Sequence, residues 1–228
     1  MACLIAAGLS PKADAQFGNL LKAPGSAPAG TVVSKADFSK LLDSTTGNVL
    51  AARIEFFRAQ ADLASALGLK NDSLIKASEG LRAVEGPSSS PGDRVKALQD
   101  STTTTEESRK ELSDALAKSD TLSDESKAKF LQGTVKFIQA VVLEKAQSEA
   151  IEKLVAEGKA LASSASMFEK IKVLSLIKPA TTMATIVPGD VKEGATTFGQ
   201  ITSFAQKQNI QMPSESEQMN KLGGGDAP

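Results

Sequence analysis

Residues 130–165 read FLQGTVKFIQAVVLEKAQSEAIEKLVAEGKALASSA, a run of 36 residues without proline. It is rich in alanine, leucine, glutamate, lysine and glutamine, which all favour helix. In its middle, residues 135–143 (VKFIQAVVL) place apolar side chains around most of the circumference of a helix. A helix with one solvent-exposed face has a single apolar stripe and does not show that distribution. We therefore predict a long central helix that other helices cover from more than one side. The fold class is all-α: an up-and-down or kinked bundle of about six to eight helices, with an elongated bundle as one form of it.

The composition excludes several classes of function. The 228 residues are 41% apolar, which is enough for a core, and 26 basic against 27 acidic residues leave a net charge of -1. No overall field therefore draws the chain to nucleic acid or to an anionic membrane. The chain has no His, Trp or Tyr, so the common zinc ligand and the His-dependent catalytic constellations are missing. We expect no enzymatic activity, no cofactor and no metal ion.

The N-terminus has features of an export signal. An apolar run over residues 2–9 is followed by Ala13 and Ala15, which form an A-x-A cleavage pattern. A basic segment before this run is missing, which suggests that the true start lies upstream. An ordinary flexible N-terminus is the alternative. We expect a bacterial periplasmic protein with a signal peptide over 1–15, a flexible linker over 16–33, a helical bundle over 34–210 and a disordered tail over 211–228.

The most regular apolar pattern lies between residues 49 and 66. Large and small apolar side chains alternate there at spacings of three and four residues. A second apolar row runs beside the first, so half of this helix requires packing partners. The partners are neighbouring helices or a second copy of the chain, which leaves a homo-oligomer open. The seam consists of Val49, Ala52, Phe56, Ala59, Leu63 and Ala66.

Capping and breaking residues predict the boundaries of the N-terminal helices. Ser34 and Asp37 form a capping-box pattern that opens a helix, and the TTGN of residues 45–48 is expected to interrupt it. Gly68 is expected to end the seam helix as a C-cap. Residues 86–92 (GPSSSPG) form a loop that separates either neighbouring helices or two subdomains.

The same reasoning predicts three boundaries in the C-terminal half. Thr104 with Glu107 makes a capping box, so a helix is expected to begin there. Pro179 is expected to stop a helix at Lys178, because the residue before a proline is pushed out of the helical region. Asp190 is then expected to cap the last helix.

Candidate catalytic groups are confined to carboxylates, hydroxyls and lysines. Acidic pairs at residues 106–107, at residues 124–125, and at Glu149 and Glu152 lie in first turns or on polar faces. Charges there stabilise helix ends or form i,i+4 pairs. No catalytic constellation is found. A carboxylate-based hydrolase stays open only because a sequence does not show whether two acids meet in one cleft.

A set of Met and Phe residues suggests an apolar groove. The segment from residue 167 to residue 204 is rich in both and is interrupted by two prolines, and Met suits adaptable apolar surfaces. The alternative is the closing layer of the core, which is what such stripes mostly are. The groove would be lined by Phe137, Met167, Phe168, Met183, Phe198 and Phe204.

The expected function is that of an exported, non-enzymatic helical interaction protein. As an envelope scaffold, adaptor or chaperone-like helper, it would bind a protein partner through its helical faces. The alternative is a carrier that holds an apolar small molecule or lipid in the groove. We expect no nucleic-acid partner, and no segment reaches the roughly 18 apolar residues of a membrane span.

Overall fold

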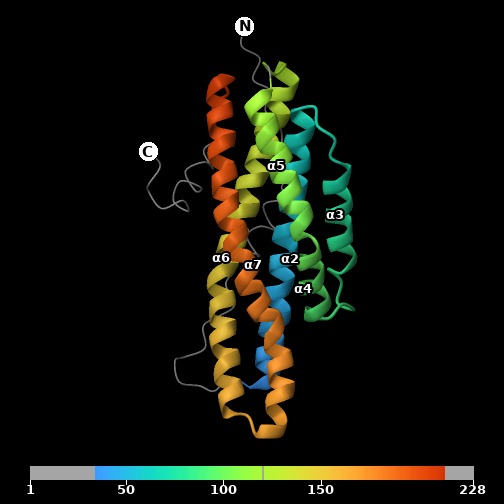
Figure 1. Ribbon diagram of the computed structural model, residues 1–228, viewed down its shortest axis with the longest axis vertical. Helices are drawn as coiled ribbons and strands as arrows, with labels where there is room; N and C mark the ends of the chain where they lie inside the picture. The colour runs from blue at the N-terminus through green and yellow to red at the C-terminus, as the bar shows by residue number, and fades with distance from the viewer. Residues whose placement is uncertain (1–33, 120, 214–228) are drawn as a thin grey trace.

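A computed structural model describes residues 34–119 and 121–213. The predicted signal peptide, the linker and most of the predicted tail lie outside these residues. The described part of the chain is helical and contains no strand, which confirms the predicted all-α bundle. The bundle is elongated (Figure 1). Its helices are α2 (Lys35–Ala66), α3 (Asp72–Ala83), α4 (Pro91–Asp100), α5 (Thr102–Lys118), α6 (Asp124–Ser164) and α7 (Met167–Lys207).

The three long helices form the body of the molecule. α2, α6 and α7 run along the long axis, and α6 packs against both of the others (Figure 1). The short helices α3 and α4 pack on α2, while α5 contacts α7 and α2. At the lower end, a Cβ atom on Gly158 of α6 would lie 2.8 Å from Ile177 of α7 and 3.2 Å from Phe38 of α2. That end is therefore built by the beginning of α2, the end of α6 and the beginning of α7.

α6 is the predicted central helix. It begins after Ser123, whose hydroxyl accepts a hydrogen bond from the backbone N–H of Ser126 at 3.2 Å and so satisfies one of the free donors of the first turn. Its apolar side chains are buried along most of its length, from Phe130 to Leu154. α2 and α7 cover it on two sides, which confirms the expectation from its apolar circumference.

The apolar seam of α2 is confirmed as a packing surface. All six of its side chains are buried, and the ring of Phe56 lies 5.2 Å from that of Phe137 on α6. The seam is therefore occupied within a single chain. Gly68 follows the helix with φ of 73°, a left-handed conformation that ends helices and that only glycine adopts at low cost.

The predicted interruption of α2 is wrong, although its predicted start is confirmed. The Ser34 hydroxyl accepts a hydrogen bond from the backbone N–H of Asp37, as expected for the cap. Residues 45–48 then continue the helix. Thr46 is buried, and its hydroxyl donates to the carbonyl of Leu42 at 2.6 Å. The polar group that lowers helix propensity is thus satisfied by the preceding turn of the same helix.

α4 and α5 begin earlier than predicted. Pro91 opens α4 inside the expected loop, because Ser90 and Asp93 form a reciprocal capping box in front of it. α5 begins at Thr102, so the predicted cap at Thr104 is wrong. The hydroxyl of Thr105 donates to the carbonyl of the preceding turn, as in α2. The α3–α4 connection, residues 84–90, therefore keeps the length of the expected loop but lies two residues earlier, and the α4–α5 connection is reduced to Ser101.

α7 continues through both of its prolines, so the predicted stop at Lys178 and the predicted cap at Asp190 are wrong. A proline inside a helix costs about 3 kcal/mol, through a lost hydrogen bond and a clash with the preceding turn. Pro188 is exposed, while Met183 and Val187 on another face of α7 are fully buried in the core. Burial of that apolar face outweighs the local cost of the prolines.

The close approach of α2 and α6 gives the first prediction. A Cβ atom on Gly133 would lie 3.0 Å from both the backbone nitrogen and Cγ of Leu63. Because the backbone of α2 cannot move aside freely, we expect Gly133→Ala to lower the free energy of unfolding by about 1–3 kcal/mol. Urea denaturation measures the change.

The matched control for this prediction is Gly199→Ala in α7. A Cβ atom on Gly199 meets nothing within 4 Å. We expect the free energy of unfolding of this variant to rise by about 0.5–1 kcal/mol, because alanine has a better helix propensity than glycine. Equal effects of the two substitutions would contradict the packing argument.

Candidate functional site

The interior of the bundle contains an ionic cluster that the sequence analysis missed. Arg53 of α2 is fully buried, and its guanidinium group reaches three other helices. Nε donates to Oε1 of Glu144 on α6 at 3.0 Å, and Nη1 donates to the hydroxyl of Thr105 on α5 at 3.0 Å. Nη2 donates to the carboxylate of Asp190 on α7. We call these four residues the Arg53 cluster.

Burial and charge act in opposite directions on the acid–base properties of the cluster. Burial raises the pKa of Glu144 to about 7, although the attraction of Arg53 opposes the shift. Burial also disfavours the charged form of Arg53, but the carboxylates of Glu144 and Asp190 outweigh it and raise the pKa of the guanidinium. Oε2 of Glu144 is buried and has no hydrogen-bond partner within residues 34–119 and 121–213.

The polar layer continues from the Arg53 cluster toward the surface. Arg109 of α5 forms an ion pair with Glu193 of α7, one turn beyond Asp190. An open cleft of about 270 Å³ lies beside this pair, between α5 and α7. Its other lining residues are Glu106, Lys110, Ser113, Thr196, Thr197 and Gln200. The cleft is shallow and carries charges of both signs, so it presents no preference for a cation or an anion.

The arrangement of the Arg53 cluster fits a structural role. Arg53 and Glu144 are inaccessible to solvent, and Asp190 is 5% exposed. The guanidinium N–H groups donate to side chains on three different helices, and these hydrogen bonds fix those helices relative to α2. A buried ionic group specifies register in some helical proteins, and we interpret this cluster in the same way.

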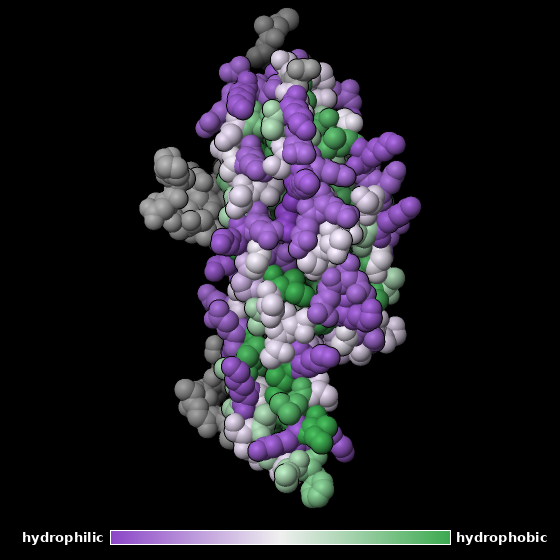
Figure 2. Space-filling model, viewed as in Figure 1, coloured by the Kyte–Doolittle hydropathy of each residue, from purple (hydrophilic) through white to green (hydrophobic). Residues whose placement is uncertain are grey.

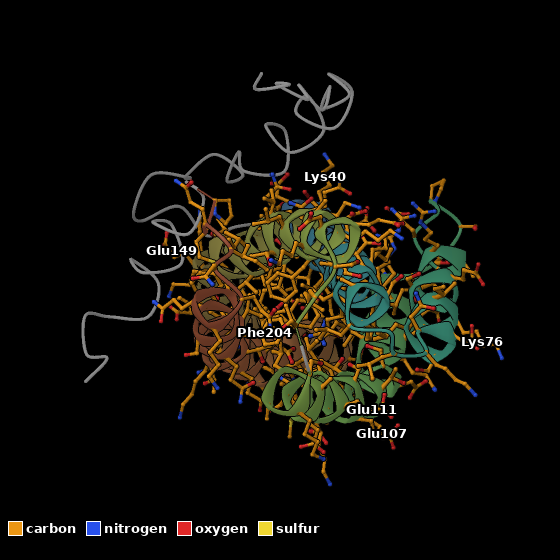
Figure 3. The ribbon with its side chains drawn as sticks, turned by 90° about the horizontal axis from the view of Figure 1, so that it is seen from above. Lys40, Lys76, Glu107, Glu111, Glu149 and Phe204 are labelled. Atoms are coloured by element: carbon orange, nitrogen blue, oxygen red, sulfur yellow. The ribbon has the colours of Figure 1, made fainter. Side chains whose placement is uncertain are left out.

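The six residues predicted to line an apolar groove do not come together. Phe137, Phe198 and Phe204 are buried in the core cluster of the upper half, where the ring of Phe204 lies 5.3 Å from that of Phe130. Figure 3 shows Phe204 on the inside of the bundle, while the labelled Lys and Glu side chains point outward. Met183 belongs to a second core cluster. The two remaining residues, Met167 and Phe168, are on the surface.

The beginning of α7 exposes an apolar surface. Four large side chains there are largely accessible: Met167 (85%), Phe168 (91%), Ile171 (76%) and Leu174 (58%). They lie on the side of α7 that faces away from the buried Val173 and Ile177, because each residue advances by about 100° around a helix. We call these four residues the α7 tip face. Figure 2 shows apolar residues gathered at this lower end of the molecule.

A signal for the α7 tip face was present in the sequence but was ambiguous. Residues 167–178 read MFEKIKVLSLIK, with apolar residues on both sides of the helix and lysines between them. A helix that is apolar on two sides has two packing partners in a core, or one partner and one free surface. Only the position of α7 at the end of the bundle distinguishes these cases.

Within the part of the chain that the structure describes, no group of three or more acidic, His or Cys side chains is placed to hold a metal ion. None of the helices described above combines the length and the apolarity that a bilayer span requires. Comparison with models of protein families, with curated proteins and with solved structures finds no match to this chain.

Proposed function

We propose that this protein is a non-enzymatic helical interaction protein that docks through the α7 tip face. The single observation that carries the proposal is the exposure of four large apolar side chains on one side of α7. Among the described residues, the other exposed large apolar side chain is Ile75, which lies on α3, 42% exposed. Scattered exposed apolar residues are normal, whereas a contiguous group marks an interaction surface.

The energy available at this surface is sufficient for specific docking. Full burial of a large apolar side chain contributes about 1.5–3 kcal/mol. Four such side chains offset a substantial part of the cost of association. The side chains beneath them, Val173 and Ile177, are buried in the core, so the tip face is held on a packed helix. A prepositioned surface loses less entropy on binding than a flexible one.

Export to the periplasm is the second part of the proposal. It rests on the pattern in residues 1–15, which lie outside the described residues. Cell fractionation followed by N-terminal sequencing tests it, and a mature chain that begins at Gln16 is the expected result. A cytosolic protein that retains Met1 would contradict export and leave the docking proposal intact. The carrier hypothesis stays a prediction that gains no support here, because four of its six groove residues are packed into the core.

Site-specific photocrosslinking in intact cells tests the docking proposal. A photoreactive phenylalanine derivative at Phe168 is expected to form a discrete adduct with the partner, detected by mass spectrometry as a protein or a lipid. The same group at Glu149, an exposed residue of α6, is the matched control and is expected to form none. Adding Met167→Ser and Ile171→Ser should abolish the adduct at position 168. Equal crosslinking at positions 168 and 149 would contradict the proposal.

A further inference from the structure

We infer that the α7 tip face inserts into an anionic lipid surface. The inference rests on the proposed docking function and names the partner of the same surface. Phe, Met, Ile and Leu project from one side of an amphipathic helical segment, with lysines around them. That combination is characteristic of helices that bury an apolar face in the boundary between lipid headgroups and acyl chains.

The charge around the tip favours an anionic partner. The lower end of the bundle comprises residues 35–41 of α2 and residues 157–178 of α6 and α7. These two segments hold six lysines and three acidic residues, a net charge of +3, although the whole chain carries -1. All six lysines are exposed: Lys35, Lys40, Lys159, Lys170, Lys172 and Lys178. Each lysine near an anionic membrane surface strengthens partitioning by about fivefold.

Three acidic residues, Asp37, Glu157 and Glu169, oppose the lysines at the tip. Asp37 accepts a hydrogen bond from the Ser34 hydroxyl at the start of α2, and Glu169 accepts one from the Ser166 hydroxyl at the start of α7. Glu157 is only partly exposed. These three carboxylates keep their charge, and the tip is net positive because six lysines outnumber them.

The positions of the lysines match an interfacial orientation. Lys170 and Lys172 lie on the two flanks of the tip face, because successive residues of a helix are about 100° apart. Their aliphatic stems can follow the apolar surface while the ammonium groups reach the headgroups. Phe168 and Ile171 would then enter the acyl region between two positively charged borders.

Shape and charge disfavour the other occupants of the tip. The tip face lies at the end of the bundle, beside the turn that joins α6 to α7 (Figure 1). A projecting end enters a deformable lipid surface without a matching cavity, whereas a protein partner would have to supply a groove for it. A second copy of the chain would bring two sets of lysines together, and the repulsion of like charges opposes that pairing.

Vesicle binding of the full-length protein tests the inference. The chain has no Trp, so Phe168→Trp introduces one fluorescent reporter at the tip face. We expect its emission to shift to shorter wavelength with vesicles of phosphatidylglycerol and phosphatidylcholine in equal amounts, and to stay unchanged with phosphatidylcholine alone. Ile75→Trp on α3 is the matched control, and its emission should not respond to either vesicle.

Cosedimentation gives the size of the effect. Phe168→Ser with Ile171→Ser is expected to lower partitioning into the anionic vesicles by about 100-fold or more. Lys170→Gln with Lys172→Gln is expected to lower it by roughly 30-fold and to reduce its dependence on salt. All four side chains are exposed, so thermal unfolding should be unchanged in both variants.

Two outcomes would overturn the inference: no binding to anionic vesicles, or binding that survives Phe168→Ser with Ile171→Ser. If the protein does not bind anionic vesicles but crosslinking at position 168 captures one defined protein, the lipid inference is wrong and the docking function stands. If neither vesicles nor crosslinking report an occupant, both are wrong.

Discussion

Replacing Arg53 with methionine is expected to lower the free energy of unfolding by about 3–5 kcal/mol. The substitution leaves the carboxylates of Glu144 and Asp190 inside the bundle without their countercharge, and Thr105 loses the donor to its hydroxyl. Small domains are stable by about 5–15 kcal/mol, so this loss is a large part of the total. Urea denaturation followed by circular dichroism at neutral pH measures it.

Arg58→Met is the matched control for this substitution. Arg58 lies on the same helix and pairs with Glu55 at 2.7 Å, but both side chains are about one-third exposed. Exposed pairs contribute less than about 1 kcal/mol, so we expect a small change. A loss as large as that of Arg53→Met would show that the cluster is not special.

Replacing the whole cluster separates stability from specificity. The variant Arg53→Met, Glu144→Leu, Asp190→Leu removes the buried charges together, and we expect it to regain most of the loss of the single variant. If it is stable but its near-ultraviolet circular dichroism loses definition, the cluster specifies the helix register. A variant as unstable as Arg53→Met alone would contradict the electrostatic explanation.

The second large effect that we expect is a dependence of the stability of the fold on pH, caused by Glu144. Because burial raises the pKa of Glu144 to about 7, the folded protein holds this proton more tightly than the unfolded chain, where the pKa is near 4.5. The contribution of this proton to the free energy of unfolding is complete below about pH 4.5 and is lost as pH rises through about 7. Between pH 5 and pH 8, the free energy of unfolding of the wild type should fall by up to about 3 kcal/mol relative to that of Glu144→Gln.

Parallel denaturation curves at several pH values test this dependence. Glu111→Gln, at an exposed position of α5, is the control. It keeps Glu144 and should therefore follow the wild type across the range. If the stability difference between the wild type and Glu144→Gln stays constant from pH 5 to pH 8, Glu144 does not titrate in this window.

Local sequence patterns predicted the helices that bury an apolar face. The seam between residues 49 and 66 and the central helix were both identified from apolar spacing, and Ser34 and Gly68 were identified from capping chemistry. These features depend on residues within one or two turns of each other. The sequence carries that information directly.

The predicted breaks failed for one physical reason. Threonines 45–46, threonines 102–105 and the two prolines of α7 each disfavour helix locally, yet all lie inside helices. Burial against neighbouring helices stabilises these segments by more than the local cost. Propensity describes an isolated segment and does not include those neighbours.

By itself, the sequence determined an all-α bundle with a long central helix, because the period of apolar residues is a property of each segment. Only the tertiary structure decided where individual charges and apolar residues lie. It placed Arg53 beside Glu144 and Asp190, which are 91 and 137 residues away along the chain. It also gathered six lysines and the α7 tip face at one end of a chain whose net charge is -1. Both arrangements depend on how distant helices pack, and no local pattern encodes that packing.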